Sequence, residues 1–279
     1  MKKENSWQKN ILYSLLALIL STMIFLGYNA YTEAKAYEKV TATLVSHMSA
    51  EKLAEFQLKE LAETFSLGFY QNDKKKNLEK LSALGEEHKK RSQEYALYFM
   101  LLLFGILGSY FLLSLRAFTF FGSLASLITL VFGLIAPIMM VTIHKEVEYL
   151  GDVVLSFESK GVIGSISKLF ENGDLVVALV ILLFSVLIPT VKILSLLFVS
   201  VFMESKFAHG IVRFFKMIGK WSMVDVFVVA TFLVYLTVDK GEVSRAEVEV
   251  GLYFFLVYVI VSMLVSLSAD KMLQNNKAV

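Results

Sequence analysis

The stretch DLVVALVILLFSVLIPTVKILSLLFVSVFM, residues 174–203, decides the fold class of this chain. Its thirty residues include one aspartate at the first position and one lysine, Lys192, and almost all the others are apolar. An α-helix needs about 20 mostly apolar residues to cross the hydrocarbon core of a bilayer. The stretch therefore predicts a membrane-spanning helix that contains a basic side chain.

Further apolar stretches predict spanning helices in the rest of the chain, at roughly 10–30, 95–115, 118–143, 222–238 and 250–268. The 279 residues are 56% hydrophobic and 19% charged, whereas soluble domains average about 45–50% and about 25%. This composition excludes a single soluble globular enzyme and a disordered chain. We expect an all-α membrane protein with six transmembrane helices.

The basic residues predict how the chain is oriented in the membrane. With the N-terminus inside, the cytoplasmic segments hold most of the lysines and arginines that flank the spans, whereas acids outnumber bases in the short outer loops. This distribution agrees with the positive-inside rule. We therefore expect both termini in the cytoplasm, with residues 1–30 retained as an uncleaved anchor helix.

The longest polar segment, residues 31–94, lies on the expected outer side. Apolar residues recur in it at helical spacing, and charged residues occupy the intervening positions. The segment predicts a helical hairpin that stands on the first two spans, with residues 95–116 forming the second of them. The hairpin is either a packed, solvated helix pair or a docking or ligand-sensing module.

A second outer segment, residues 144–173, predicts a small strand-and-helix cap. Apolar and polar residues alternate at 153–157, which is typical of a strand, and a short amphipathic helix follows and ends at Gly173. Asp174 is placed to cap the next span. We expect this cap to belong to a four-span core at 117–270, followed by a cytoplasmic tail at 271–279.

Most catalytic constellations are missing from the sequence. It contains no cysteine, no P-loop, no G-x-S-x-G elbow and no H-E-x-x-H motif, and its four histidines lie on different segments. The net charge of +2 and the lack of a basic stripe outside the membrane flanks argue against nucleic-acid binding. We expect neither an enzyme nor a cofactor or metal site.

Ionisable residues inside apolar spans are the most informative functional signal. Lys192 lies well within one span, and Asp225 lies early in the next. A charge at the centre of a membrane helix costs at least ~2.5–3.5 kcal/mol, so such side chains usually face the bundle interior and pair. We therefore predict an ion pair between Lys192 and Asp225 on adjacent antiparallel spans.

Hydroxyl side chains and a proline accompany this pair. Ser185 and Ser222 share its helix faces, Ser262 lies in the last span, and Pro189 frees a backbone carbonyl near Lys192. Two interpretations stay open. One is a polar path or proton-sensitive switch inside the bundle, and the other is a structural ion pair that fixes the helix register.

The inner loop at 204–220 predicts an interfacial helix on an anionic inner leaflet, or a connector with basic topology signals. Apolar side chains fall on one helical face, and basic ones fall on the opposite face: Lys206, Arg213, Lys216 and Lys220. Trp221 follows as an expected interfacial anchor.

The run GKWSMVDVFVVA at 219–230 closely resembles a signature of the paraquat-inducible protein A family. PTVK at 189–192, LIAPIMMVTI at 134–143 and GLYFFLVYVIVSML at 251–264 resemble other parts of that family's spans. The resemblance covers roughly 117–270. It implies a four-span bundle of the tetraspanin or claudin type with an outer strand cap, in a bacterial inner membrane.

The resemblance also implies a role and a partner. Relatives work with mammalian-cell-entry (MCE) proteins, which shuttle lipids between the two envelope membranes, and a polar network in the bundle is thought to matter for transport. By position, that network corresponds to Ser185, Lys192, Ser222, Asp225 and Ser262. This chain departs from the family by lacking a Cys-x-x-Cys zinc ribbon, by having one core unit instead of two, and by adding two N-terminal spans and a hairpin.

We therefore expect an integral inner-membrane component of a lipid-transport system. It would load phospholipid or another envelope lipid into an MCE-type partner, or receive lipid from that partner. The alternative is a membrane sensor or assembly scaffold for envelope stress without transport activity, which the outer hairpin on paired spans favours.

Overall fold

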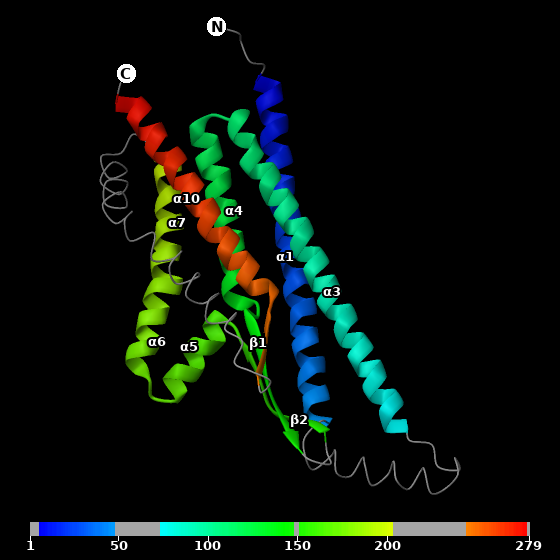
Figure 1. Cartoon of the computed structure of the whole chain (residues 1–279). Coiled ribbons are helices and arrows are strands. Elements are labelled where there is room, and N and C mark those ends of the chain that lie inside the picture. Colours follow the sequence, from blue (N-terminus) through cyan, green and yellow to red (C-terminus); the bar gives the residue numbers. More distant parts are fainter. Residues whose placement is uncertain (1–5, 48–72, 148–150, 203–243, 278–279) are drawn as a thin grey trace, which may run out of the picture.

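The computed structural model describes residues 6–47, 73–147, 151–202 and 244–277. Two long helices, α1 (Ser6–His47) and α3 (Asp73–Gly108), lie side by side and run antiparallel (Figure 1). They have 42 and 36 residues, so at 1.5 Å per residue they are roughly 60 and 50 Å long. Both are longer than the hydrocarbon core of about 30 Å, and they therefore extend beyond it. The predicted connection of this hairpin lies outside the described residues.

Beside this pair stand the other described helices of the bundle: α4 (Leu115–Ile135), α6 (Leu175–Ile181), the π-helix η2 (Leu182–Leu187), α7 (Ile188–Val201) and α10 (Val250–Lys277). In the described part of the chain, 5 helices are long and apolar enough to cross a membrane. The span predicted at 222–238 lies outside that part. Helix α4 is central, because it packs against both α10 and α7 (Figure 1).

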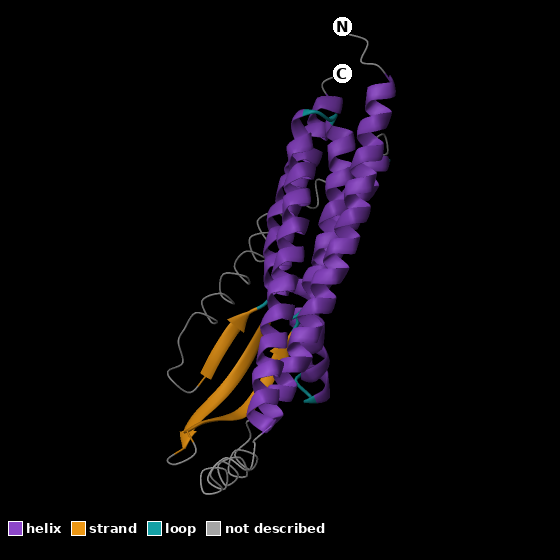
Figure 2. Cartoon of the chain, turned by 90° about the vertical axis from the view of Figure 1, so that its right-hand side faces the viewer, coloured by secondary structure: helices purple, strands orange, loops and turns teal. Residues whose placement is uncertain are grey.

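A small antiparallel sheet lies at one end of the bundle (Figure 2). Its order is β2-β1-β3, with β1 at Met139–Val147, β2 at Gly151–Lys160 and β3 at Ser244–Val248. The helix α5 (Val162–Glu171) follows β2, and Gly173 then turns the chain with a φ of 85°. The strand predicted at 153–157 and the amphipathic helix that ends before Gly173 are confirmed. Asp174 occupies the N-cap position of α6, but its side chain makes no capping hydrogen bond.

One predicted span is wrong in its extent. The apolar stretch 118–143 predicts a helix that contains Pro137, whereas α4 ends at Ile135 and the chain from Met139 is strand β1. Proline disfavours the helical conformation in the residue before it, and Ala136 accordingly adopts a ψ of 152°. Pro137 therefore joins a membrane helix to the sheet instead of kinking a helix.

The first described turn of α1 and the last turn of α10 lie at the same end of the bundle, opposite the sheet (Figure 1).

Phe99, Phe132 and Phe254 meet near the centre of the fold, with ring centroids 4.9–6.2 Å apart, and they connect α3, α4 and α10. The hairpin and the bundle consequently share one hydrophobic core.

Glycines allow α4 and α10 to approach closely. A Cβ on Gly133 would lie 2.9 Å from the backbone nitrogen of Phe255, and a Cβ on Gly122 would lie 2.7 Å from Val265 Cγ2. In a bilayer, the hydrophobic effect does not drive helices together. Their association therefore depends on close packing of this kind. A Cβ on Gly251, at the start of α10, would also meet the carbonyl oxygens of Ala136 and Pro137 at 2.6 Å.

We expect Gly133→Ala to lower the free energy of unfolding by about 1–3 kcal/mol, because the added methyl group meets backbone atoms that cannot rotate away. The control is Gly105→Ala on α3, where a Cβ meets nothing within 4 Å. Thermal or denaturant unfolding of the detergent-purified protein measures both. Equal stability of the two variants would contradict the close packing of α4 against α10.

Candidate functional site

Lys192 lies inside the bundle, on α7, with 8% of its surface exposed. Its ammonium group donates a hydrogen bond to Ser262 Oγ on α10, over 3.3 Å. Ser262 is fully buried and donates its own proton to the carbonyl of Val259 at 3.0 Å. A hydroxyl can donate once and still accept, so the lone pairs of Ser262 are available to the lysine.

The register of α4 against α10 adds further polar groups at this height. Gly122 packs against Val265 and Gly133 against Phe255, so Ser126 lies on α4 at about the height of Ser262. Ser126 is 1% exposed, and its hydroxyl has no hydrogen-bond partner among the described residues.

Two more hydroxyl groups lie one helical turn from Ser126 and Ser262. Tyr258 is fully buried one turn before Ser262, and its side chain packs in the same cluster as Ile193, the neighbour of Lys192. Ser123 is also fully buried and, within the described ranges, its hydroxyl has no hydrogen-bond partner. We call Lys192, Ser262, Ser126, Ser123 and Tyr258 the central polar layer.

A proline changes the backbone immediately before Lys192. Pro189 has no N–H and cannot satisfy the carbonyl four residues earlier, on Ser185. The chain responds with the six-residue π-helix η2, after which the N–H of Ile188 bonds to the carbonyl of Leu183. Short π segments are often found at functional sites. Ser185 lies half-buried within η2, and Pro189 is buried one turn before Lys192.

Only some of the residues predicted to form the site can be located. The structure brings Lys192 and Ser262 into contact and places Pro189 and Ser185 on the preceding turns of the same span. The others lie outside the described residues: Asp225, Ser222, Trp221, Arg213, Lys216 and Lys220. The Lys192–Asp225 ion pair therefore stays a prediction.

Sequence reasoning missed Ser123, Ser126 and Tyr258. A signal for the serines exists in α4, where small hydroxyl residues recur three or four positions apart and all four are buried: Thr119, Ser123, Ser126 and Thr129. This spacing keeps the hydroxyls on one side of the helix. Tyr258 carries no comparable signal, because aromatic residues are common throughout the last span.

A second polar cluster lies outside the spans and holds the hairpin to the sheet. Tyr37 on α1 donates to Glu247 Oε2 on β3 at 3.0 Å, and Lys89 on α3 donates to the same oxygen at 2.7 Å. The ammonium group of Lys89 also lies 5.4 Å from the centre of the Tyr37 ring. We call Tyr37, Lys89 and Glu247 the hairpin clamp.

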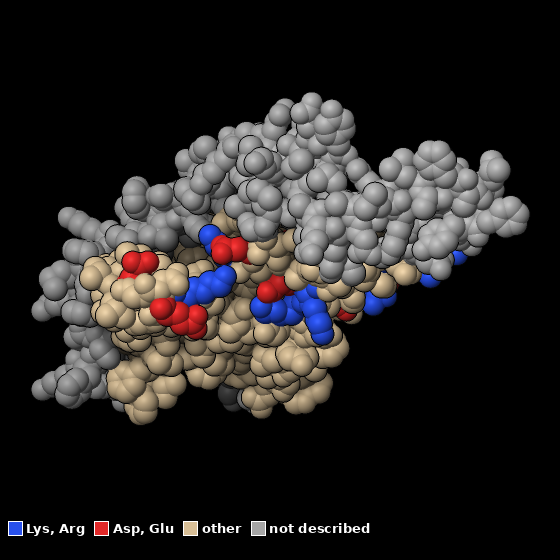
Figure 3. All heavy atoms as spheres, turned by 90° about the horizontal axis from the view of Figure 1, so that it is seen from below, with Lys and Arg blue, Asp and Glu red and all other residues tan. Residues whose placement is uncertain are grey.

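Electrostatics favour the charged form of Glu247. Burial by itself would raise the pKa of its carboxyl, but the hydrogen bond and charge of Lys89, with the hydrogen bond from Tyr37, hold that pKa below its usual range. Acidic and basic side chains lie side by side on this end of the molecule (Figure 3). Glu247 therefore stays ionised at neutral pH and keeps its ion pair with Lys89.

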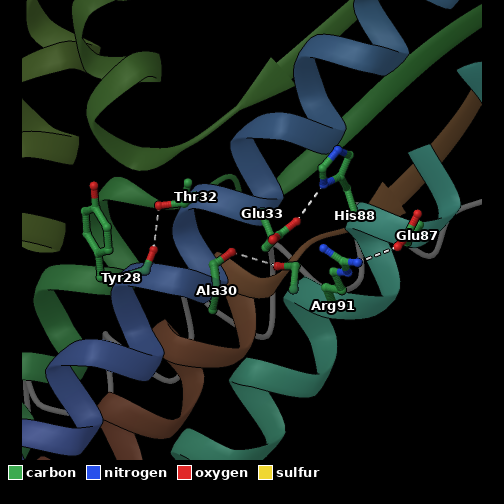
Figure 4. Close-up of polar contacts among 8 residues, drawn as sticks. Tyr28, Ala30, Thr32, Glu33, Glu87, His88 and Arg91 are labelled. Carbon is green, nitrogen blue, oxygen red and sulfur yellow. Dashed lines mark hydrogen bonds and ion pairs between the residues drawn. The ribbon is translucent and has the colours of Figure 1, made fainter. Parts of the chain in front are cut away.

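The two helices of the hairpin are also bonded to each other near the clamp. His88 Nδ1 lies 2.6 Å from Glu33 Oε2, and Ser92 donates to the carbonyl of Ala30 at 2.8 Å (Figure 4). These contacts fix the register of α1 against α3 where the pair emerges beside the sheet.

Apolar helices of spanning length, joined to a small sheet, define a multi-pass membrane protein. The sequence profile of one family, described as paraquat-inducible protein A, matches residues 115–275. The match extends over more than half of the chain, so the chain belongs to the paraquat-inducible protein A family. The resemblance recognised in the sequence at 117–270 is thereby confirmed.

A curated protein of Haemophilus influenzae (strain ATCC 51907 / DSM 11121 / KW20 / Rd) bears the name "probable intermembrane transport protein". It is 27% identical to this chain over 117 residues, which are 40% of this chain and 28% of the relative. The match thus covers less than a third of that protein. No solved structure matches the chain.

We expect Ser262→Ala to destabilise the protein, because it removes a buried hydrogen-bond acceptor of the Lys192 ammonium group. Hydrogen bonds to charged groups contribute roughly 1.5–3 kcal/mol. The control is Ser266→Ala, one turn further along α10 at a half-buried position. Unfolding of both purified variants gives the comparison, and an unchanged stability for Ser262→Ala would contradict the assigned contact.

Proposed function

We propose that this protein is the inner-membrane component of a system that transports lipid between the membranes of a bacterial envelope. In this proposal it loads lipid into an MCE-type partner protein, or receives lipid from it. The observation that carries the proposal is the buried ammonium group of Lys192 in the middle of a membrane bundle, within a layer of hydroxyl groups.

Such a layer is costly in a purely structural bundle. A buried charge needs partners, and the hydroxyls of Ser123 and Ser126, which have no partner among the described residues, lose the hydrogen bonds they would make with water. Polar groups retained at this depth usually face the bundle interior and mark pathways for ions, protons or substrates. The central polar layer therefore suits a gate for the polar headgroup of a lipid, or a point where transport is coupled to protonation.

Family membership and the relative's name support the same role. The chain belongs to the paraquat-inducible protein A family, and the relative from Haemophilus influenzae is named as a probable intermembrane transport protein. The distribution of basic residues favours a cytoplasmic location for both termini. The sheet and hairpin would then face the periplasm, where an envelope-spanning partner is accessible.

Transport requires Lys192 if the central polar layer acts on lipid. We expect Lys192→Met and Asp225→Asn to abolish lipid transport by the full chain in cells, whereas the proteins still fold. Lipid that co-purifies with the detergent-extracted protein, measured by mass spectrometry, should fall by about tenfold or more, because the charged group that would bind a headgroup is lost. The matched control is Lys168→Met on α5, at an exposed position outside the spans.

Folding of each variant is checked by size-exclusion chromatography and thermal unfolding. If both variants fold and retain wild-type transport and wild-type lipid content, the gating role of the layer is wrong. A structural ion pair predicts a different outcome, namely lower stability of the variants with transport retained by the molecules that fold.

The hairpin favours a second candidate, a membrane sensor or assembly scaffold, because the clamp ties an outer module directly to the core of the fold. Deletion of residues 35–90 separates the two. The ends to be joined are close, since Ser92 bonds to the carbonyl of Ala30, and a short glycine-serine linker can connect them. A transport core should retain partial lipid transport after this deletion, whereas a sensor or scaffold should lose all function in the cell.

A further inference from the structure

Glu249 is a buried carboxyl group at the junction between the sheet and the bundle. It lies between the end of β3 at Val248 and the start of α10 at Val250, and it is only 4% exposed. Its backbone is fixed on both sides, because its N–H bonds to the carbonyl of Ile138 at 2.8 Å and its carbonyl accepts from Leu252 at 3.1 Å. The side chain therefore cannot reach water without movement of neighbouring elements.

The hydrogen bonds of the described side chains at this junction go to carboxylates other than Glu249. Lys89 on α3 and Tyr37 on α1 both donate to Glu247, and Lys35 pairs with Glu38 at 2.8 Å. Glu249 Oε1 has no hydrogen-bond partner in the described part of the chain. An ionised carboxylate in such a place is costly, whereas a protonated carboxyl carries no charge.

The charged and titratable groups around Glu249 come from three elements. Tyr37 and Glu38 on α1 and Lys89 on α3 interact with it electrostatically, and Glu247 precedes it on β3. Two of these groups are carboxylates that oppose a further negative charge, and one is a lysine that favours it. The surroundings thus combine burial with an excess of acid.

We propose that Glu249 is a proton-binding site that controls how firmly the α1–α3 hairpin docks on the sheet. When the carboxyl is protonated, the hairpin packs over a neutral group and the clamp closes the junction. When it is ionised, the buried negative charge favours separation of the hairpin from the sheet, which gives Glu249 access to water.

The direction of the pH dependence follows from the two states. Burial raises the pKa of Glu249 from 4.5 to about 7, opposed by the charge of Lys89 and reinforced by Glu247 and Glu38. Because the docked state binds this proton more tightly than an exposed state, docking weakens as pH rises from about 4.5 to about 7 and stays weak above that range. The lowered pKa of Glu247 keeps its ion pair with Lys89 intact throughout the upper part of this window.

The proposed site adds a control point that is separate from the central polar layer. Helix α10 begins directly after Glu249 and carries Ser262, the hydrogen-bond partner of Lys192. A rearrangement at Glu249 would therefore act on α10, the helix that contributes Ser262 to the central polar layer. The proton would be taken up on the sheet side of the membrane.

Spin-label distances between the hairpin and the core test the proposal directly. The natural chain contains no cysteine, so Lys90→Cys on α3 and Glu171→Cys on α5 give two unique labelling sites at exposed positions. The full-length protein in lipid nanodiscs is measured by pulsed electron spin resonance at pH 5.5 and pH 8. We expect the ratio of separated to docked hairpin to rise at least about tenfold at pH 8, since one pKa unit corresponds to a tenfold change.

Three variants locate the titrating group. Glu249→Gln mimics the neutral carboxyl and should keep the docked distance at both pH values. Glu79→Gln is the matched control, since this carboxyl lies at an exposed position of α3, and it should retain the response. His88→Gln, which affects a contact between the two helices of the hairpin, should retain it as well.

Infrared difference spectroscopy of the unsubstituted protein does not depend on whether a variant folds. We expect a protonated-carboxyl band to appear between pH 8 and pH 5.5 and to be missing from folded Glu249→Gln. A distance distribution that does not change with pH, an unaltered pH response in Glu249→Gln, or the lack of any carboxyl protonation above pH 5.5 would each overturn the proposal.

Discussion

The hydrocarbon interior of a bilayer offers no hydrogen bonds, and this constraint governs the whole structure. It makes helices the required form for the spans, because a helix satisfies its own backbone groups. It also makes Lys192 conspicuous, since a buried ammonium group must find its partners within the protein. One of them is Ser262, which is itself bonded to a backbone carbonyl. The polar groups of α4, α7 and α10 are best understood through this requirement.

Close packing and a local backbone irregularity together create the central polar layer. Gly122 and Gly133 bring α4 against α10, which places Ser126 at the height of Ser262. Pro189 shifts the backbone before Lys192 into a π-helix, which changes the direction in which the following side chains point. Neither feature is needed to cross the membrane. Both contribute to the arrangement of polar side chains at its centre.

The sheet end of the molecule follows different physics, because its charged side chains lie beyond the apolar spans. The hairpin clamp uses ion pairing and hydrogen bonds to hold α1 and α3 to β3, and the nearby Glu249 Oε1 has no hydrogen-bond partner among the residues that the structure describes. Helix α10 leads from that junction to the central polar layer. The protein thus has a polar centre and a polar junction at the sheet, and one continuous helix connects them.

The sequence by itself determined the membrane class, the described spans, the hairpin helices, the strand at 153–157 and the burial of Lys192 inside the bundle, because these depend on local composition and periodicity. It misplaced the end of α4, since the apolar run through Pro137 continues into the first residues of β1, which composition cannot distinguish from a helix. Only the tertiary structure decided that Ser262 meets Lys192, that Ser126 and Tyr258 share their level, and that Glu249 is buried beside the clamp. These facts depend on how helices distant in sequence are aligned, and side-chain packing between them sets that alignment.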